Sequence, residues 1–304
     1  MQIGMIGLGR MGANMTRRLL QAGHQVIAFD LDHQAVQAVT EDGAAPAGNL
    51  AELVEQLTQP RAIWMMVPAG GPTQATIDRL LPLLAEGDTL IDGGNSNYQE
   101  SQARAASAAE AGVHYLDVGV SGGVWGLKEG YALMIGGPTD AVTRLTTIFQ
   151  ALAPSADMGW AHVGPSGAGH FVKMVHNGIE YGMMQAYAEG FAILQAKDDL
   201  NLDLHQIAQA WRFGTVIRSW LLDLTARALE ADPGLDQVGA WVDDSGEGRW
   251  TVNEAVSLGV PAPVISHSLF ARFRSRRPDN YADKLLAAMR HQFGGHAIHP
   301  DDSS

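Results

Sequence analysis

Short apolar runs alternate with amphipathic stretches over the first half of the chain. Six runs have the length, the apolar content and the Gly, Asp or Pro boundaries of buried strands: 3–6, 26–29, 63–67, 89–91, 114–118 and 132–135. Between them lie stretches with helical periodicity, among them 13–22, 34–39, 49–56 and 98–111. This alternation predicts βαβ units and a mostly parallel, doubly wound sheet.

The second half shows no convincing strand from Pro165 onward. Residues 166–195 predict one unusually long helix, apolar on most of its circumference, as expected for a helix buried between domains or subunits. Five further helices are predicted at 204–213, 217–230, 249–258, 262–274 and 281–292, and the Gly- and His-rich tail 294–304 is expected to be loosely ordered. We therefore expect an α/β Rossmann-type N-terminal domain, residues 1–163, followed by an all-α C-terminal domain, residues 164–304, with a long interdomain helix.

Composition excludes several classes of protein. The chain has no cysteine, which removes disulfides, thiolate metal sites and cysteine nucleophiles. Its formal net charge is 20 − 33 = −13, which disfavours non-specific binding to nucleic acid or to an anionic membrane. No apolar run approaches the roughly 18 residues of a transmembrane helix, and the N-terminus has no charged leader or cleavage site, so the expected compartment is the cytoplasm.

A glycine loop follows the first predicted strand and opens the first predicted helix. Its sequence is Gly7-Leu8-Gly9-Arg10-Met11-Gly12, a G-x-G-x-x-G. In such a loop the first glycine permits a tight turn, the second lets the backbone approach a pyrophosphate, and the third allows close packing of helix and strand. The motif alone is weak evidence in a chain with 35 glycines, but here strand and helix flank it correctly. We expect a dinucleotide site, against the alternative of a purely structural turn.

Asp30 ends the second predicted strand, about 20 residues beyond the glycines, where a carboxylate can accept hydrogen bonds from the adenosine ribose hydroxyls. A 2′-phosphate at this point would be repelled by Asp30 and Asp32, and no Arg or Lys stands between Arg18 and Arg61. NAD is therefore expected in preference to NADP. A second glycine-rich segment, 164–171, has P-loop spacing, but His170 and Phe171 replace the Lys and Ser or Thr that an NTPase needs.

Four polar residues lie at positions i, i+3, i+4 and i+7 of the long predicted helix: Lys173, His176, Asn177 and Glu180. This spacing directs them from one face, over roughly 10 Å along the axis. One interpretation is a solvated face or an ordinary Lys–Glu pair. The other is a substrate cleft, because the stripe mixes a cation, an imidazole, an amide and a carboxylate among apolar neighbours. Beside a nicotinamide, Lys173 could abstract a hydroxyl proton and Glu180 could supply a second acid.

Together these segments resemble the 6-phosphogluconate dehydrogenase family, within the β-hydroxyacid dehydrogenase superfamily. The resemblance is collinear over nearly the whole chain and rests on segments 7–15, 91–98, 120–123, 167–181, 248–251 and 290–296. The glycine loop and the Lys-x-x-x-Asn element are widely shared. Glu180, the Asp-Gly-Gly-Asn-Ser segment and the final Arg-x-x-Phe-Gly-x-His are more particular to this family.

The resemblance implies roles for individual residues. Lys173 takes the place of the family's general base and acid, and Glu180 that of the acid that protonates C1 of the product. The positions for the sugar carboxylate and hydroxyls are Asn95, Ser121, Gly122, Gly123, His176 and Asn177. The phosphate set is Tyr181, Arg249, Thr251, Arg272 and Arg290, assisted by His296. The cofactor positions are Gly7, Leu8, Gly9, Arg10, Met11, Gly12, Asp30, Val67 and Asn95.

The implied reaction oxidises C3 of 6-phosphogluconate to a 3-keto acid that loses carbon dioxide without a metal and yields ribulose 5-phosphate. The implied substrate is therefore a small phosphorylated sugar acid. The chain is shorter than the long members and resembles the short, NAD-preferring branch. In longer members the last segment reaches a partner subunit, so Arg290 and His296 could act in cis or in trans in a homodimer or homotetramer. Arg249 replaces a Lys found in many relatives, which is compatible with phosphate binding.

Alternatives remain at this point. A relative acting on an unphosphorylated acid such as 3-hydroxyisobutyrate, without decarboxylation, would need neither Glu180 nor the arginines. A non-enzymatic NAD(H) sensor would bind cofactor without turnover. The arginines at 272, 274, 276 and 277 could form a nucleic-acid patch or, apart from Arg272, a solvated helix end. With Arg290 they are instead expected to form a cationic region suited to a phosphorylated acid. The tail histidines lack the spacing of a metal site.

Overall fold

The computed structural model describes residues 1–277 and 281–294, and it divides into two compact units, Met1–His176 and Asn177–Ser304. The first unit is built on a single sheet of eight strands in the order β3-β2-β1-β4-β5-β6-β7-β8. The strands are β1 (Gln2–Ile6), β2 (Gln25–Phe29), β3 (Ala45–Pro46), β4 (Ala62–Met65), β5 (Thr89–Asp92), β6 (His114–Ser121), β7 (Ala132–Gly136) and β8 (Trp160–Gly164). All neighbouring pairs are parallel except β6 and β7.

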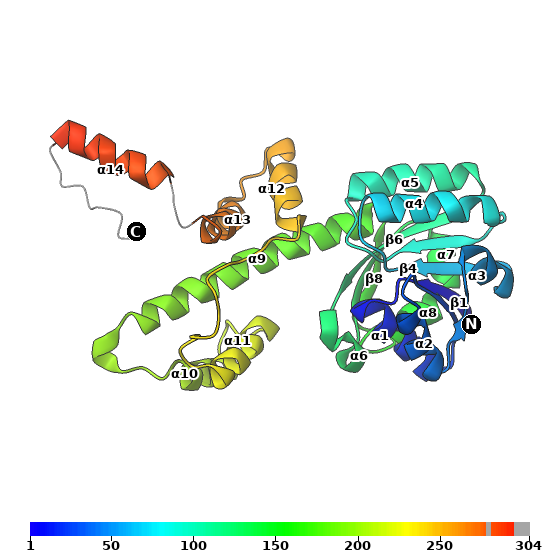
Figure 1. The fold of residues 1–304 in the computed structure, drawn as a ribbon, viewed down its shortest axis with the longest axis horizontal. Coiled ribbons are helices and arrows are strands. Elements are labelled where there is room, and N and C mark those ends of the chain that lie inside the picture. Colours follow the sequence, from blue (N-terminus) through cyan, green and yellow to red (C-terminus); the bar gives the residue numbers. More distant parts are fainter. Residues whose placement is uncertain (278–280, 295–304) are drawn as a thin grey trace. The chain divides into compact units, whose positions relative to one another are not determined.

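Helices cover both faces of this sheet (Figure 1). One face is covered by α3 (Leu50–Gln56), α4 (Gly71–Leu80) and α5 (Tyr98–Glu110). The other is covered by α1 (Arg10–Gln21), α2 (His33–Glu41), α7 (Thr139–Arg144) and α8 (Thr146–Leu152), with short α6 (Gly126–Glu129) packed on α1. Short 3-10 turns lie at Leu81–Leu83 and Gly123–Trp125. The strands are consequently buried on both sides, which explains their continuous apolar runs.

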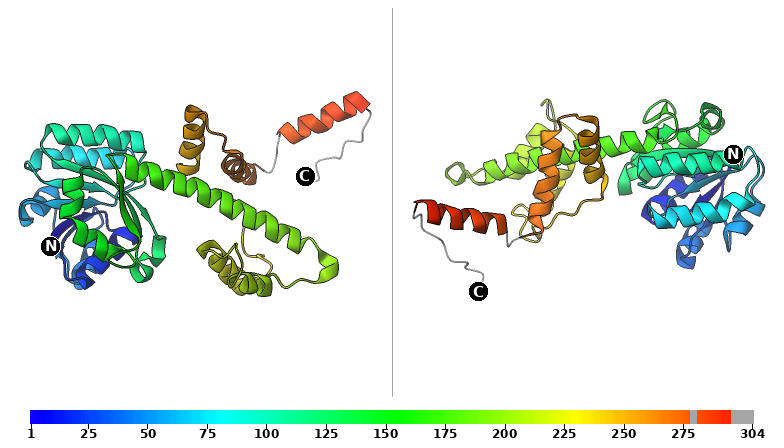
Figure 2. Two further views of the ribbon diagram at one scale, coloured as in Figure 1. Left: turned by 180° about the vertical axis from the view of Figure 1, so that it is seen from behind. Right: turned by 90° about the horizontal axis from the view of Figure 1, so that it is seen from above.

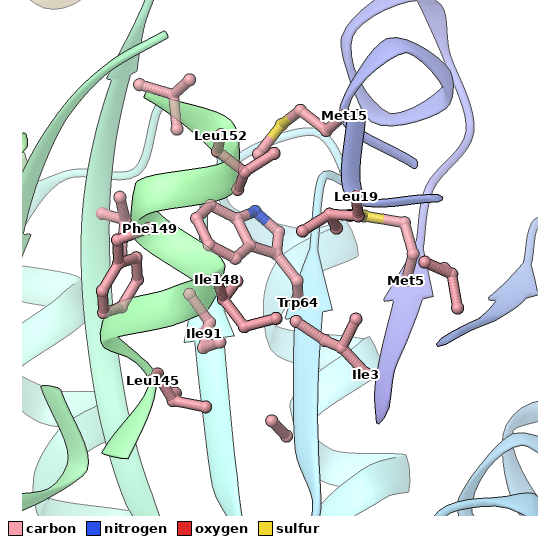
Figure 3. Close-up of a cluster of buried hydrophobic side chains, with 14 of the residues drawn as sticks. Ile3, Met5, Met15, Leu19, Trp64, Ile91, Leu145, Ile148, Phe149 and Leu152 are labelled. Carbon is pink, nitrogen blue, oxygen red and sulfur yellow. The ribbon is translucent and has the colours of Figure 1, made fainter. Parts of the chain in front are cut away.

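The two cores follow from the two-residue period of the strands. Met5 and Trp64 face α1 and α8, whereas Ile6 and Ile63 face the α3–α5 layer. Trp64 is fully buried among side chains of β1, α1 and α8, with its ring edge-on to Phe149 at 6.2 Å (Figure 3).

The helix α9 (Ala168–Gln195) begins in the first unit and continues without a break into the second. The described part of the second unit then contains the 3-10 turn Asp198–Leu200 and five helices: α10 (Leu204–Trp211), α11 (Trp220–Ala231), α12 (Glu247–Leu258), α13 (Pro263–Ser275) and α14 (Tyr281–Gly294). Helices α10 and α11 lie side by side (Figure 2) and enclose a small core of Ala208, Leu222, Ala226 and Leu229. Helix α12 packs on α13.

The expected fold class is confirmed: a Rossmann-type domain precedes a helical domain, and one long helix belongs to both units. Two strands lie outside the predicted set. β3 is only two residues long, and β8 is an edge strand whose side chains are mostly exposed, so neither has an apolar run to reveal it. The domain boundary at 163/164 stays a prediction, and the tail 295–304 lies outside the described residues. No helix among residues 1–277 and 281–294 is long and apolar enough to cross a membrane.

Candidate active site

The glycine loop joins β1 to α1, and its three glycines meet different surroundings. Gly7 has φ +90°, and a Cβ there would lie 2.5 Å from the Met66 carbonyl oxygen. At Gly12 a Cβ would lie 1.9 Å from the Gly7 carbonyl oxygen. At Gly9 a Cβ would meet no atom of the described chain within 4 Å. Gly7 and Gly12 are therefore required for packing, whereas Gly9 leaves room at the helix N-terminus for a ligand to approach the backbone.

Asp30 follows β2 and is bonded to the glycine loop. Its Oδ2 accepts a hydrogen bond from the Leu8 backbone N–H, and its Oδ1 accepts one from Asp32 N at 2.9 Å. Each carboxylate oxygen has a second lone pair, so both can accept further hydrogen bonds from a ribose. The half-buried side chain is thus held against the loop that it was predicted to serve.

The carboxyl ends of β4 and β5 lie beside the glycine loop. A Cβ on Gly7 would be 3.3 Å from Val67 Cγ1, and a Cβ on Gly94 would be 2.9 Å from the Val67 carbonyl oxygen. Exposed Asn95 follows Gly94 directly. The structure therefore brings three of the predicted cofactor positions, Gly7, Val67 and Asn95, to one edge of the sheet.

A fully buried carboxylate, Asp92, organises the loop that carries Asn95. It accepts hydrogen bonds from Gly94 N at 3.0 Å, Ser96 Oγ at 2.7 Å and Tyr115 Oη at 2.8 Å. Arg104 Nη1 lies 3.6 Å from Asp92 and partly balances its charge. Burial, then the neighbouring Asp92 charge, raises the pKa of Tyr115 well above its usual value, so its hydroxyl remains a donor to this carboxylate.

Lys173 is buried, with only 6% of its surface exposed. Its stem passes directly over the backbone of β6: a Cβ on Gly119 would lie 2.3 Å from Lys173 Cβ. Two residues further along the same strand is half-buried Ser121, followed by Gly122 and Gly123, both at positive φ. The structure thus places the Lys173 stem two residues from the predicted substrate segment 121–123.

The other members of the predicted stripe lie on α9 as their spacing requires. Asn177 is buried, with 9% exposed, while His176 and Glu180 are half-buried. A solvated charged face would leave all four side chains exposed, so their burial argues against that interpretation.

Within the second unit, the predicted phosphate residues of α9, α12 and α13 gather around Tyr181. The Arg272 guanidinium lies 3.6 Å above the Tyr181 ring and donates to the Asp243 carbonyl oxygen at 2.7 Å. A Cβ on Gly248 would be 2.5 Å from the same ring, and Ser245 N donates to Tyr181 Oη at 3.0 Å.

Thr251 of α12 packs against α9 one turn before Tyr181, because a Cβ on Gly178 would be 2.6 Å from the Thr251 methyl group. Arg249 stacks 4.6 Å above the Phe273 ring. The side chains of Tyr181, Arg249, Thr251 and Arg272 therefore belong to one neighbourhood.

A buried carboxylate, Asp244, holds two of the arginines there. It is paired with Arg249 Nε at 2.6 Å and with Arg276 Nη2 at 2.8 Å, and its side chain is 3% exposed. The hydrogen bond from Arg249, followed by that from Arg276, lowers the pKa of Asp244 to about 2 against burial, which acts in the opposite direction. Arg274 pairs instead with Asp283 at 2.9 Å. Ion pairing within the protein thus accounts for much of the cationic run that resembled a nucleic-acid patch.

Two predicted residues are not joined to this neighbourhood by the structure. Arg290 is exposed on α14, and His296 lies outside the described residues. Among the described residues no group of three or more His, Asp or Glu side chains could hold a metal ion. The sequence analysis did not identify three acidic residues, Asp92, Asp117 and Asp244, because a single acidic residue carries no motif. Asp117 accepts a hydrogen bond from the start of α9. The only available signal was for Asp92, which opens the Asp-Gly-Gly-Asn-Ser segment.

A Rossmann-type sheet domain with its glycine loop, followed by a helical domain that shares a long helix with it, defines a dinucleotide-binding protein of two domains. Residues 2–163 match the family model for the NAD binding domain of 6-phosphogluconate dehydrogenase, and residues 169–292 match that for its C-terminal domain. The chain belongs to the 6-phosphogluconate dehydrogenase family, and its residues 2–163 form an NAD-binding domain.

Individual relatives agree with this assignment. The chain is 48% identical over 299 residues to the NAD(+)-dependent, decarboxylating 6-phosphogluconate dehydrogenase of Haloferax volcanii, covering 98% of both chains. It superposes on Plasmodium falciparum 6-phosphogluconate dehydrogenase with a TM-score of 0.84 and 29% identity, covering 100% of this chain and 67% of that one. The 3-hydroxyisobutyrate dehydrogenase of Mycobacterium tuberculosis gives a TM-score of 0.72 at 23% identity, covering 95% and 99%, and shares the fold.

The Asp244 pairing gives a testable pKa. In the folded protein this carboxyl should titrate near 2, and in Arg249→Gln its pKa should rise toward the ordinary 3.8, because the principal hydrogen-bond donor is lost. The pairing therefore contributes stability above pH ~4, and that contribution disappears as the pH falls through 2. Carboxyl ¹³C NMR titration measures the value directly. Arg274→Gln is the matched control, since Arg274 pairs with Asp283, and an Asp244 pKa near 4 in the unaltered protein would contradict the assignment.

Proposed function

We propose that this protein catalyses the NAD-dependent oxidative decarboxylation of 6-phosphogluconate to ribulose 5-phosphate and carbon dioxide. The observation that carries the proposal is the stripe on α9, where Lys173 and Asn177 are buried and Glu180 is half-buried on one helical face. Support comes from the Haloferax volcanii relative, whose name states a decarboxylating, NAD(+)-dependent enzyme and which matches 98% of the chain.

The residues of the first unit fit a dinucleotide. The open position at Gly9, the α1 N-terminus and the carboxylate of Asp30 offer room, a partial positive charge and ribose acceptors. Leu8, Arg10, Met11, Val67 and Asn95 complete the proposed cofactor set, which lies around the loop and the carboxyl ends of the adjoining strands. NAD supplies a hydride acceptor when bound.

Lys173 is proposed to act as the general base and then as a general acid. Its side chain is buried on the helical face that also carries Asn177 and Glu180, and a lysine amine there can take the proton of the C3 hydroxyl as C3 is oxidised. The resulting carbonyl is β to the carboxylate, so the C1–C2 bond of the substrate can break and release carbon dioxide. The protonated Lys173 donates to the carbonyl oxygen as the enediol forms.

Glu180 is proposed to protonate C1 of the enediol while the C2 hydroxyl of the enediol returns its proton to Lys173, which yields the ketone. It lies two turns from Lys173 on the same helix, roughly 10 Å along the axis, so the two groups can serve different atoms of an extended sugar acid.

The substrate's carboxylate and hydroxyls are assigned to Asn95, Ser121, Gly122, Gly123, His176 and Asn177. Its phosphate is assigned to Tyr181, Arg249, Thr251, Arg272 and Arg290, with His296 assisting. The gathering of Arg249 and Arg272 around Tyr181 supports a phosphorylated substrate, since an unphosphorylated hydroxy acid requires no such group. This cluster is the observation that disfavours a 3-hydroxyisobutyrate dehydrogenase, despite the shared fold.

We also propose that the protein is a homodimer or homotetramer. The second unit exposes large apolar side chains of α9, including Ile179 and Ile193 at 53% and 72%. A pocket of about 340 Å³ in the same unit is lined by Met183, Tyr187, Phe191, Trp211, Val216 and neighbouring residues, almost entirely with apolar atoms. Exposed apolar surface of this kind marks a protein interface. The expected cytoplasmic location and the absence of nucleic-acid and membrane partners stay predictions.

The reaction is tested by adding 6-phosphogluconate with NAD and following NADH and carbon dioxide together. We expect both in equal amounts, and we expect Lys173→Met to lose NADH formation by at least about 1000-fold, because the general base is absent. Fluorescence titration should show that the variant still binds NADH. Near-normal turnover of Lys173→Met would contradict its role, and NADH without carbon dioxide would favour the non-decarboxylating alternative. NADH binding without turnover in the unaltered protein would favour the sensor.

Cofactor preference is tested at Asp30. Replacement by Ser removes the negative charge that would repel a 2′-phosphate, so the ratio of kcat/KM for NADP to that for NAD should rise by about tenfold or more. Asp42→Ser, which loses an exposed carboxylate paired with Arg17, is the matched control. An unchanged ratio in Asp30→Ser would count against the role of Asp30.

Oligomer formation is tested on α9. Ile193→Asp places a charge on the exposed apolar surface and should lower the mass measured by light scattering during size-exclusion chromatography. Ile193→Leu retains the apolar character and should leave the mass unchanged. A monomeric unaltered protein would rule out the proposal.

A further inference from the structure

The first turn of α9 is held by buried polar contacts that do not lie on its polar stripe. Asp117, in the middle of β6 and fully buried, accepts hydrogen bonds from two backbone N–H groups at the start of the helix. Its Oδ1 accepts from Gly167 N at 2.6 Å and its Oδ2 from His170 N at 2.9 Å. It is therefore an N-terminal cap supplied by a strand 50 residues earlier in the sequence, and its charge opposes the positive end of the helix dipole.

A second contact joins the same turn to α5. His170 Nδ1 lies 2.7 Å from Ser101 Oγ, and both side chains are buried. Ser101 Oγ also lies 3.2 Å from the Asn97 carbonyl oxygen, so this hydroxyl links His170 to the N-cap residue of α5. Asn97 caps α5 directly after the segment of Asp92 to Ser96, so this chain of hydrogen bonds connects the loop carrying Asn95 to α9.

Glycines let the helix approach the strands at backbone distance. A Cβ on Gly169 would lie 2.2 Å from the Asp117 carbonyl oxygen and 2.5 Å from that of Met134. A Cβ on Gly136 would lie 2.6 Å from Asp117 Oδ1. Such distances leave the first turn no freedom to slide or rotate without breaking contact.

Asp117, Gly119 and Ser121 alternate along β6 and so share one face of the strand. The first bonds the start of α9, the second contacts the Lys173 stem, and the third opens the proposed substrate segment. One strand face therefore sets the position of the helix, of the lysine it carries and of the segment that the lysine is proposed to serve.

We infer that Asp117, supported by the Ser101–His170 hydrogen bond, is a positioning residue for Lys173: it fixes the rotation and axial position of α9 so that the lysine amine meets the substrate hydroxyl. We call Asp117, Ser101 and His170 the α9 anchor. The inference rests on the proposed role of Lys173 as the general base. An error in that placement slows proton removal and the accompanying oxidation more than it weakens binding.

The test is Asp117→Asn, which preserves the shape of the side chain. It replaces one carboxylate oxygen by an NH₂ group, which cannot accept a hydrogen bond from the backbone N–H of Gly167 or His170. We expect kcat per folded active site to fall at least tenfold, with KM for 6-phosphogluconate and Kd for NADH changing less than threefold. With substrate deuterated at C3, the isotope effect on kcat should rise, because hydride transfer becomes more rate-limiting. A purely structural role would lower the melting temperature without changing the isotope effect.

Asp88→Asn is the matched control. Asp88 is also fully buried and accepts hydrogen bonds from Arg61 N, Arg61 Nη1 and Ala85 N. It lies at the amino-terminal end of β5, however, whereas Ser121 lies at the carboxyl end of the neighbouring strand β6. It should lose stability with unchanged kcat and isotope effect.

If Asp117→Asn does not fold, the same measurements on Ser101→Ala test the inference. It should lower kcat several-fold and raise the isotope effect, whereas an unchanged isotope effect in either folded variant overturns the inference. Turnover by Lys173→Met would instead overturn the proposed function itself, so the two failures are distinguishable.

Discussion

The structure depends on the close contact between the start of α9 and the β6–β7 pair. The antiparallel β7 places Gly136 opposite Asp117, and the absence of side chains at Gly136 and Gly169 leaves space for a carboxylate and a helix backbone together. Because side-chain directions repeat along a helix, the orientation of this first turn determines where Lys173, Asn177 and Glu180 face. Two backbone N–H groups and the positive end of the helix dipole compensate the lost hydration of the buried Asp117 carboxylate.

Glycine has a different function at each point of the candidate site. At Gly7 and Gly12 a side chain would strike the backbone of the loop or of the adjoining strand, so these residues are required by the fold itself. At Gly9 the neighbouring space is open among the described residues, so packing does not explain the residue, whereas approach of a phosphate to the backbone does. Of the three glycines in the motif, Gly9 is therefore the one that supports a bound dinucleotide, because packing does not account for it.

The sequence predicted what depends on local pattern. Apolar runs located six strands, and helical periodicity located α9 and the five helices after it, α10 to α14. Motif spacing located the glycine loop and the polar stripe that contains Lys173. It could not predict β8, whose edge position leaves its side chains exposed, or the reversal of β7, which depends on pairing. Nor could it reveal Asp117 or Asp244, because each is defined only by tertiary contact. Asp117 caps a helix from 50 residues earlier in the sequence, and Asp244 is shared by Arg249 of α12 and Arg276, which directly follows α13.

The distribution of charge explains how a chain of net charge −13 could still bind a phosphate. Asp244 does not exhaust the donors of its partners, because it contacts only Nε and Nη2 of Arg249, and a guanidinium has five N–H groups. The Arg272 guanidinium lies 3.6 Å above the Tyr181 ring and uses Nη1 for its bond to the Asp243 carbonyl oxygen, and a guanidinium has further N–H groups. In the proposed assignment a phosphate would therefore bind without displacing Asp244. The Asp244 carboxylate holds Arg249 in place, which would reduce the side-chain entropy that binding costs. Asp244 thus orients the guanidinium of Arg249, and the remaining N–H groups of that guanidinium are the ones proposed to bind the substrate phosphate.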